Sequence, residues 1–84
     1  MTTTERIRTF LADRFLFDAN APIDPRASLM EAGILDSTGA MELVLFLEEE
    51  FKIRVADTEL VPENLDSIER LAAFVGRKAA GVAA

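Results

Sequence analysis

The feature that most constrains the fold is an apolar stripe at helical spacing that follows Asp36. Its residues recur every three or four positions and are widened by apolar neighbours: Ala40, Val44, Leu47 and Phe51, with Met41, Leu43 and Leu45 beside them. Asp36 is a good N-cap because its carboxylate can accept backbone N–H groups of the first turn. Lys52 lies where positive charge is favoured at a helix end. The stripe therefore predicts a helix over about residues 36–52.

A first helix and a long loop are predicted ahead of this stripe. Thr2 and Glu5 have the spacing of a capping box, and apolar residues then recur at helical spacing over about residues 3–17. Residues 18–36 contain proline and glycine breaks, so they are expected to form a loop, and loops this long are usually functional or disordered. Scattered apolar residues favour a functional loop pinned to a core: Ile23, Leu29, Ile34 and Leu35.

After the stripe the chain predicts a connection and a short helix. Ile53 and Val55 alternate briefly, but a strand needs a partner and no second strand is evident, so this segment is treated as an extended connection. Residues 57–62 are expected to form a short helix, and Pro62 is expected to break the chain.

The last helix is predicted from a second capping box, Asp66 with Glu69. We expect it to fray after Gly76 or Gly81 and the alanine-rich tail to be mobile from about residue 79. The core is expected to be formed by apolar residues of these helices: Phe10, Phe15, Leu43, Val44, Leu47, Phe51, Ile68, Leu71 and Val75.

The composition excludes several chemistries. The chain has 84 residues and no cysteine or histidine, so disulfides, thiolate chemistry, the usual zinc sites and imidazole catalysis are excluded from the chain itself. This length fits one domain, residues 1–84, with a single small core. No apolar stretch approaches the ~18 residues needed to cross a bilayer, and no signal-peptide pattern is present. We expect a cytoplasmic monomer without membrane insertion.

Negative charge is concentrated in one segment. The chain has fifteen acidic and nine basic residues, a net charge of −6. Residues 31–50 contain six acids and no Lys or Arg, which leaves nine acids and nine bases elsewhere. Nucleic acid and anionic membranes require clustered Lys and Arg, so the charge argues against both. It favours a basic protein partner.

The region around Ser37 resembles the acyl carrier protein family. The resemblance is carried by Gly33-Ile34-Leu35-Asp36-Ser37, Met41-Glu42-Leu43-Val44 and Leu47-Glu48-Glu49-Glu50-Phe51-Lys52-Ile53. It implies an all-α four-helix bundle with a long loop between helices 1 and 2, a short third helix and an attachment motif opening the second helix. The chain is identified as a phosphopantetheine-binding carrier of this family, a specialised stand-alone member.

By this resemblance Ser37 receives 4′-phosphopantetheine from coenzyme A, in a transfer made by a separate phosphopantetheinyl transferase. The arm would carry acyl groups as thioesters to partner enzymes of fatty acid, lipid or specialised acyl metabolism, and the chain itself would not be an enzyme. A phosphodiester in the first turn of a helix is favoured by free N–H groups and the helix dipole. Asp36 is assigned to capping and to recognition by the transferase. Asp66-Ser67, which repeats the Leu-Asp-Ser pattern, is assigned to structural capping.

The acids of the second helix resemble the family's docking surface for basic patches on acyl ligases, acyltransferases and synthases: Glu42, Glu48 and Glu49. A solvated helix face is the alternative. Thr38 and Met41 are assigned to the same partner surface, and in this family the bundle interior can also admit an acyl chain, with Ala40 and Met41 at its mouth.

Two departures from the family pattern lie beside Ser37. Thr38 replaces the usual leucine, which favours a dedicated pathway with its own ligase or transferase. Gly39 stands where a larger residue is common, and it suggests room for backbone or arm, or a frayed first turn.

Three other functions remain open. A helical interaction module without a prosthetic group explains the charge but not the position of Asp36 and Ser37. An enzyme with Ser37 as nucleophile lacks a histidine to activate it. An aminoacyl or peptidyl carrier is the third, and the acidic second helix favours the acyl type over it.

Overall fold

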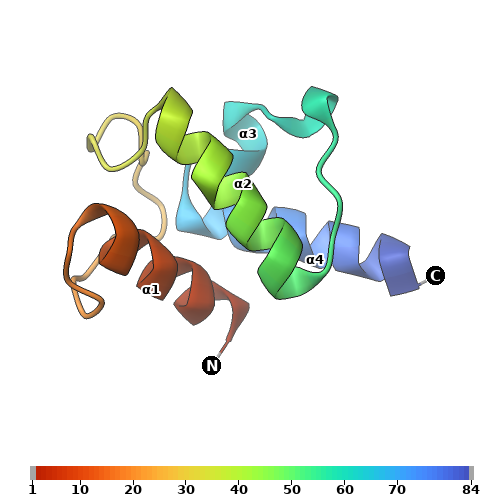
Figure 1. Cartoon of the computed structure of the whole chain (residues 1–84), viewed down its shortest axis with the longest axis horizontal. Helices are drawn as coiled ribbons and strands as arrows, with labels where there is room; N and C mark the ends of the chain where they lie inside the picture. The colour runs from red at the N-terminus through yellow and green to blue at the C-terminus, as the bar shows by residue number, and fades with distance from the viewer. Residues whose placement is uncertain (1, 84) are drawn as a thin grey trace.

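The computed structural model describes residues 2–83, with side chains over residues 2–80. Its helices are α1 (Thr3–Phe15), α2 (Ser37–Phe51), α3 (Pro62–Leu65) and α4 (Ile68–Ala83), with one turn of 3₁₀ helix, η1 (Asp57–Glu59), before α3 (Figure 1). Residues 2–83 contain no β-strand. The predicted all-α fold, with four helices, a long first loop and a short third helix, is confirmed.

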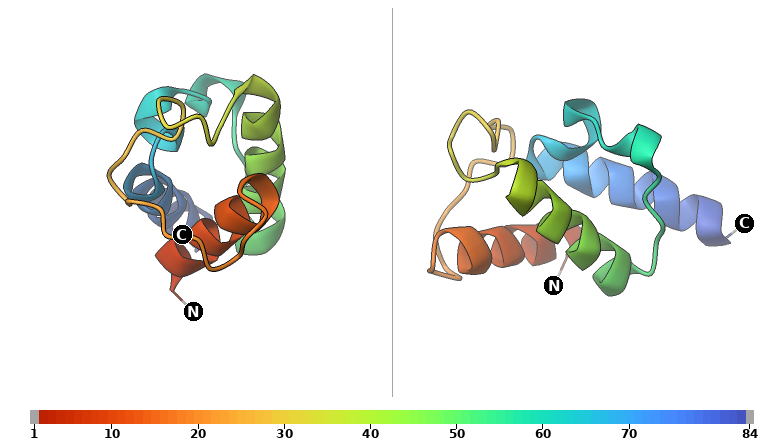
Figure 2. Two further views of the ribbon diagram at one scale, coloured as in Figure 1. Left: turned by 90° about the vertical axis from the view of Figure 1, so that its left-hand side faces the viewer. Right: turned by 45° about the horizontal axis from the view of Figure 1, so that its top comes forward.

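The helices surround one apolar interior. α4 contacts α1, α2 and α3, and an end-on view shows the four helices and the first loop enclosing a common centre (Figure 2, left). Every helix contributes apolar side chains to this core. The most completely buried of them are Phe74, Ile7, Leu11, Leu29, Leu43, Leu47, Ile68 and Leu71. Burial of this apolar surface is the main force that holds the bundle together.

The predicted core is confirmed except at three phenylalanines, Phe10, Phe15 and Phe51, which are only partly buried. They belong to an aromatic cluster between α1 and α2. The Phe10 ring stacks on the Phe46 ring with centroids 4.1 Å apart, and Phe46 meets Phe51 edge-on at 6.0 Å. Helical spacing alone cannot separate this half-exposed seam from the centre of the core.

Three predictions for the second half of the chain differ from the structure. Pro62 does not break the chain but is the first residue of α3, a position that suits proline because the first N–H of a helix has no intrahelical partner. The helix expected over residues 57–62 is only the turn η1. α4 continues through Gly76 and Gly81 to Ala83, since alanine has the highest helix propensity. The last residue of the expected mobile tail, Ala84, lies outside the described residues.

The starts of α1, α2 and α4 are capped by hydroxyl or carboxylate oxygens, whereas α3 has no side-chain cap. Thr2 Oγ1 accepts the Glu5 N–H at 3.1 Å, which is one of the two hydrogen bonds of the capping box predicted for α1. At α4 the prediction is wrong in detail, because Ser67 Oγ, not Asp66, accepts the Arg70 N–H, at 3.0 Å. The capping pattern was read correctly, but the acceptor is one residue further along.

Asp66 instead holds the long loop. Its carboxylate accepts the Ser28 hydroxyl at 2.6 Å and the Met30 N–H at 3.0 Å, and its carbonyl accepts the Leu29 N–H at 3.0 Å. At the loop's start, the Arg8 guanidinium donates to the carbonyl of Ala21 at 2.9 Å. The predicted apolar anchors are buried at Ile23, Leu29 and Leu35 and partly buried at Ile34. The loop is therefore an ordered wall of the bundle.

Candidate functional site

Ser37 is the first residue of α2 and lies exposed on the surface. Its hydroxyl forms no hydrogen bond within residues 2–83. Asp36 is the N-cap, as predicted, and its Oδ1 accepts the Gly39 N–H at 2.7 Å. The N–H groups of Ser37 and Thr38, the first two of α2, have no acceptor in the described part of the chain. The site therefore combines a free hydroxyl with two backbone donors at the positive end of a helix.

Gly39 allows close packing of α1 against the capped turn. A Cβ atom built on Gly39 would lie 2.9 Å from Phe15 Cε1 and 3.2 Å from Asp36 Oδ1. The space that the sequence suggested for the arm is thus filled by the Phe15 ring, and the first turn of α2 is capped rather than frayed. The glycine in a helix start was the visible signal, but only the fold shows what approaches it.

Ser67 provides an internal comparison with Ser37. Both serines follow Leu-Asp and begin a helix, but Ser67 is only 4% exposed and its hydroxyl oxygen caps α4. An exposed hydroxyl can be modified by another protein, whereas Ser67 cannot be reached without disturbing the core. The predicted capping role of Ser67 is confirmed, and the two copies of the motif differ in exposure.

An apolar pocket of about 190 Å³ opens beside Ser37. Its wall is formed by α2, the long loop and the segment from η1 to α3, chiefly through Met30, Leu35, Ala40, Leu60, Val61 and Leu65. Ala40 was expected at such a mouth and lines it, but Met41, which was expected beside it, is not part of the lining and points to the surface, 54% exposed. Leu60 and Val61 were not singled out, because an isolated apolar pair in a connecting segment carries no periodic signal.

The outer wall of this pocket is tied to α4 by Glu59. Glu59 Oε1 accepts the Ala56 N–H at 2.9 Å and the Lys78 ammonium at 2.9 Å. The Ala56 N–H, and then the Lys78 ammonium, hold the pKa of the Glu59 carboxyl below its ordinary value of 4.5. The charged form of Glu59 is therefore the one that fixes η1, and with it Leu60 and Val61, against α4.

The acids of α2 differ in how far they are engaged. Arg14 Nε lies 2.7 Å from Glu42 Oε2, and Arg6 of α1 pairs in the same way with Glu50 at 3.2 Å. Glu48 Oε2 accepts the Val55 N–H at 2.9 Å. Glu49 is exposed and has no partner within residues 2–83. The cations that were missing from the sequence of the helix itself thus come from α1.

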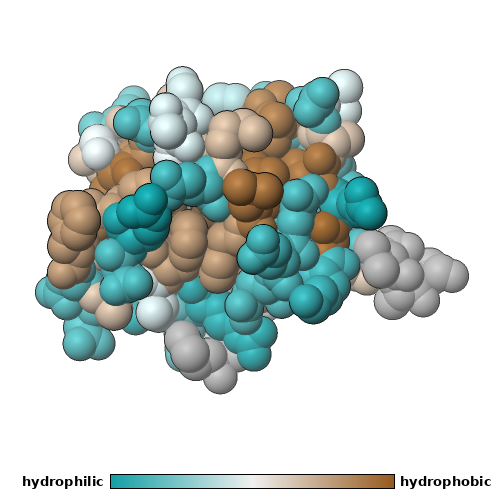
Figure 3. Space-filling view, viewed as in Figure 1, coloured by the Kyte–Doolittle hydropathy of each residue, from teal (hydrophilic) through white to brown (hydrophobic). Residues whose placement is uncertain are grey.

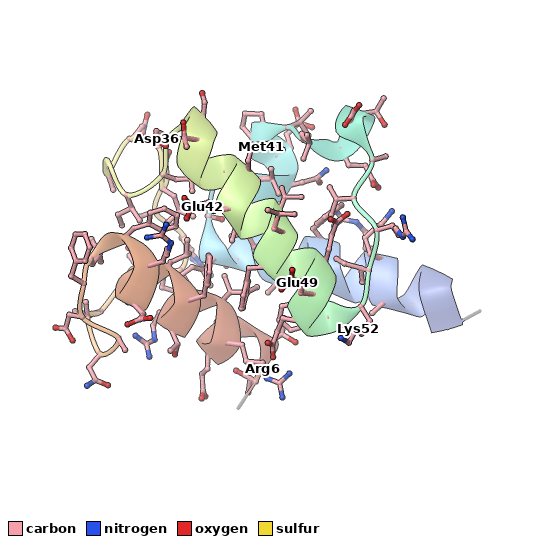
Figure 4. All side chains as sticks on the ribbon, in the orientation of Figure 1. Arg6, Asp36, Met41, Glu42, Glu49 and Lys52 are labelled. Atoms are coloured by element: carbon pink, nitrogen blue, oxygen red, sulfur yellow. The ribbon has the colours of Figure 1, made fainter. Side chains whose placement is uncertain are left out.

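Figure 4 shows how these residues lie around α2. Glu42 is on the flank toward α1, and Met41 is on the opposite flank. Asp36 and Lys52 mark the two ends of the helix. Met41 is 54% exposed and Leu45, one turn further on, is 56% exposed. The outward face of α2 is therefore apolar at its centre, with Thr38 near Ser37 and Glu49 toward the far end.

The sequence matches the family of the phosphopantetheine attachment site over residues 5–75. The chain therefore belongs to this family of carrier proteins, whose prosthetic group is 4′-phosphopantetheine and whose members are not themselves enzymes.

Three curated relatives show how broad the similarity is. An "Acyl carrier protein" of Thermosynechococcus vestitus is 32% identical over 76 residues, 90% of each chain. A "D-alanyl carrier protein" of Abiotrophia defectiva is 34% identical over 66% of this chain and 70% of its own. An "Aminoacyl carrier protein 1" of Bradyrhizobium diazoefficiens is 36% identical over 66% of this chain and 60% of its own. The similarity covers carriers of more than one kind of cargo.

The residues at the start of α2 fit a phosphopantetheine arm. The exposed Ser37 hydroxyl is a point of attachment, and the free N–H groups of Ser37 and Thr38 can face a phosphodiester. The Asp36 carboxylate is turned to the Gly39 N–H, which limits its repulsion of that phosphate. When bound, the arm supplies a terminal thiol that forms thioesters.

No helix in the described part of the chain has the length and apolar character to span a membrane.

Proposed function

We propose that the chain is an acyl carrier protein in which Ser37 carries 4′-phosphopantetheine. The observation that supports this most is the contrast between two serines in the same local pattern. Ser37 is exposed with an unbonded hydroxyl, and Ser67 is buried as a helix cap. Family membership supplies the prosthetic group.

Attachment requires a separate transferase and coenzyme A. Ser37 Oγ attacks the pantetheine-side phosphorus of the coenzyme A diphosphate. The new Oγ–P bond forms as the bond from that phosphorus to the bridging oxygen breaks, and adenosine 3′,5′-bisphosphate leaves. The hydroxyl proton passes to a base of the transferase. The Ser37 and Thr38 N–H groups stabilise the phosphodiester that remains.

The apolar pocket beside Ser37 supports an acyl cargo. Its lining is mostly aliphatic, so part of a hydrocarbon chain on the arm becomes more stable when it leaves water and enters the pocket.

The predicted partner surface is also part of the proposal: Thr38, Met41, Glu42, Glu48 and Glu49. Because Glu42 and Glu48 are engaged within the chain, we assign the main contacts to Thr38, Met41 and Glu49. Figure 3 shows apolar atoms at the surface over α2, beside polar ones.

An aminoacyl carrier is the second candidate, favoured by the D-alanyl and aminoacyl carriers among the relatives. An ammonium group on the cargo would gain nothing from an aliphatic pocket. The two candidates are separated by offering the arm-bearing chain to an acyl ligase and to an aminoacyl ligase and measuring which cargo mass it acquires.

The attachment proposal is tested by incubating the chain with coenzyme A and a phosphopantetheinyl transferase. Intact mass spectrometry should show one arm on the wild type and on Ser67→Ala, and none on Ser37→Ala. Ser67→Ala is the matched control, because it removes the second Leu-Asp-Ser hydroxyl; it should cost about 1 kcal/mol of stability through loss of the cap. A wild type that stays unmodified, or an arm on Ser37→Ala, would contradict the proposal.

A further inference from the structure

Phe17 has an unusual combination of backbone and exposure. It follows the C-cap of α1, has φ 57°, and is 88% exposed. The Asp18 N–H donates to the Ala12 carbonyl at 3.2 Å, so the chain folds back over the end of α1 at this position. Glycine is the residue that most often takes a left-handed conformation just after a helix. A phenylalanine is disfavoured there both by its Cβ atom and by the apolar ring it leaves in water. The fold does not require this side chain.

Comparison with Lys52 shows that a left-handed backbone does not by itself call for an exposed phenylalanine. It is the other described non-glycine residue with positive φ, also 57°, and it ends α2. Lys52 is charged, so its exposure is ordinary. Phe17 occupies the same kind of position with a ring that gains nothing from solvent.

The Phe17 ring borders an open groove of about 290 Å³ next to the attachment serine. Phe15, Phe17 and Ile34 form its apolar part, and Asp36, Thr38 and Gly39, which flank Ser37 in sequence, form the part under the start of α2. Apolar atoms reach the surface at the left-hand edge of Figure 3, over the segment that follows α1. This groove is distinct from the pocket toward α3, which Met30, Leu60 and Leu65 line.

The charges around the groove indicate which kind of partner fits it. Arg14 at its edge is neutralised by Glu42 at 2.7 Å, so the remaining charge is that of Asp36. Enzymes that handle the cargo can work at the far end of a long arm, but the enzyme that attaches the arm must bring coenzyme A to Ser37 Oγ itself. Because coenzyme A carries several phosphate charges, an enzyme that binds it needs cationic groups near the reacting phosphorus, and such groups would be attracted to Asp36 at the edge of the groove.

We propose that Phe17 and this groove form a docking site for the phosphopantetheinyl transferase that modifies Ser37. An apolar side chain of the transferase lies in the groove against the Phe17 ring, and a cation faces Asp36. This inference rests on the proposed function of Ser37. Large aromatic residues are frequent anchors at interfaces because they bury much area with little loss of side-chain entropy.

The test compares Phe17→Gly with Lys52→Gly as substrates of the transferase. Both remove a side chain from a left-handed residue, so both should unfold at a higher urea concentration than the wild type. Phe17→Gly should raise the transferase KM about tenfold, with kcat little changed, as for loss of one interface anchor. Lys52→Gly, at the opposite end of α2 (Figure 4), should leave KM unchanged at high salt, where the loss of its charge is screened. Phe17→Asn should behave as Phe17→Gly does, since asparagine also tolerates this backbone.

Equal KM values for Phe17→Gly and wild type, both fully modified at Ser37, would overturn this inference and leave the carrier function intact. A wild type that gains no arm would overturn the carrier function as well. A dimer of the wild type that dissociates on Phe17→Gly would assign the groove to a second copy of the chain and would also overturn it.

Discussion

Gly39 is the residue at which the attachment turn depends most on the absence of a side chain. A Cβ atom there would lie 2.9 Å from Phe15 Cε1, and we expect Gly39→Ala to destabilise the fold by about 1–2 kcal/mol, because overpacking outweighs the better helix propensity of alanine. Gly76, inside α4, has no atom within 4 Å of a built Cβ. Gly76→Ala is therefore the matched control and should stabilise by about 0.5–1 kcal/mol. Urea unfolding measures both, and stabilisation by Gly39→Ala would show that the Phe15 ring moves aside freely.

For single residues, the sequence predicts those roles that depend only on residues nearby in the chain. Asp36 as a cap and Ser37 as an exposed first residue follow from the local pattern, and both are found. The packing of Phe15 on Gly39 joins two elements separated by a long loop, and the Arg14–Glu42 pair does the same. No spacing rule reports such contacts, because they arise only when α1 and α2 have docked.

The contact between η1 and α4 is sensitive to pH through Glu59. Its folded-state pKa lies below the ordinary value of 4.5, chiefly through the Ala56 N–H and then the Lys78 ammonium. A lowered pKa means that this contribution to stability is complete above pH 4.5 and is lost as the pH falls through the folded-state value. We expect Glu59→Gln to lower the melting temperature at pH 7 and to reduce the loss of stability on acidification below pH 4.5.

The control for this experiment is Glu63→Gln, which removes an exposed acid from neighbouring α3. Thermal unfolding of both variants from pH 3 to pH 7 gives the comparison. If Glu59→Gln follows the wild-type pH profile, the Glu59–Lys78 contact does not stabilise η1.

Elements with a strong internal pattern were predicted well, and elements set by context were not. α2 carries its own apolar stripe and cap, so its limits agree with the prediction to about one residue. α3 is only four residues long, too short for any periodicity, and Pro62 fits a chain break as well as a helix start. Asp66 had the sequence position of a cap, but the loop competes for its carboxylate.

Over the whole molecule, the negative charge is less available than the sequence suggests. Glu42 and Glu50 are paired with Arg14 and Arg6 of α1, whereas Glu49 has no partner within residues 2–83. We expect Glu49→Gln to lower the transferase kcat/KM about two- to threefold at low salt, with the difference disappearing at high salt. Glu5→Gln is the matched control, since it removes an exposed acid of α1 that lies outside the acidic segment of residues 31–50, and it should change kcat/KM less.

Initial rates of the transferase at several ionic strengths would give kcat/KM for both variants. An equal effect of Glu5→Gln and Glu49→Gln would mean that the partner senses only total charge. The sequence located the acidic segment correctly, but the engagement of each acid could not be predicted, since the arginines involved lie on another helix.

The position of Asp66 has a mechanical consequence for the pocket beside Ser37. Met30 of the loop and Leu65 of α3 lie on its wall, and three hydrogen bonds at Asp66 fasten residues 28–30 to the end of α3. Loop and helix are thus coupled as one panel facing α2. If a guest enlarged the pocket, these hydrogen bonds would make residues 28–30 and Leu65 move together, and the exposed side of the loop would move with them.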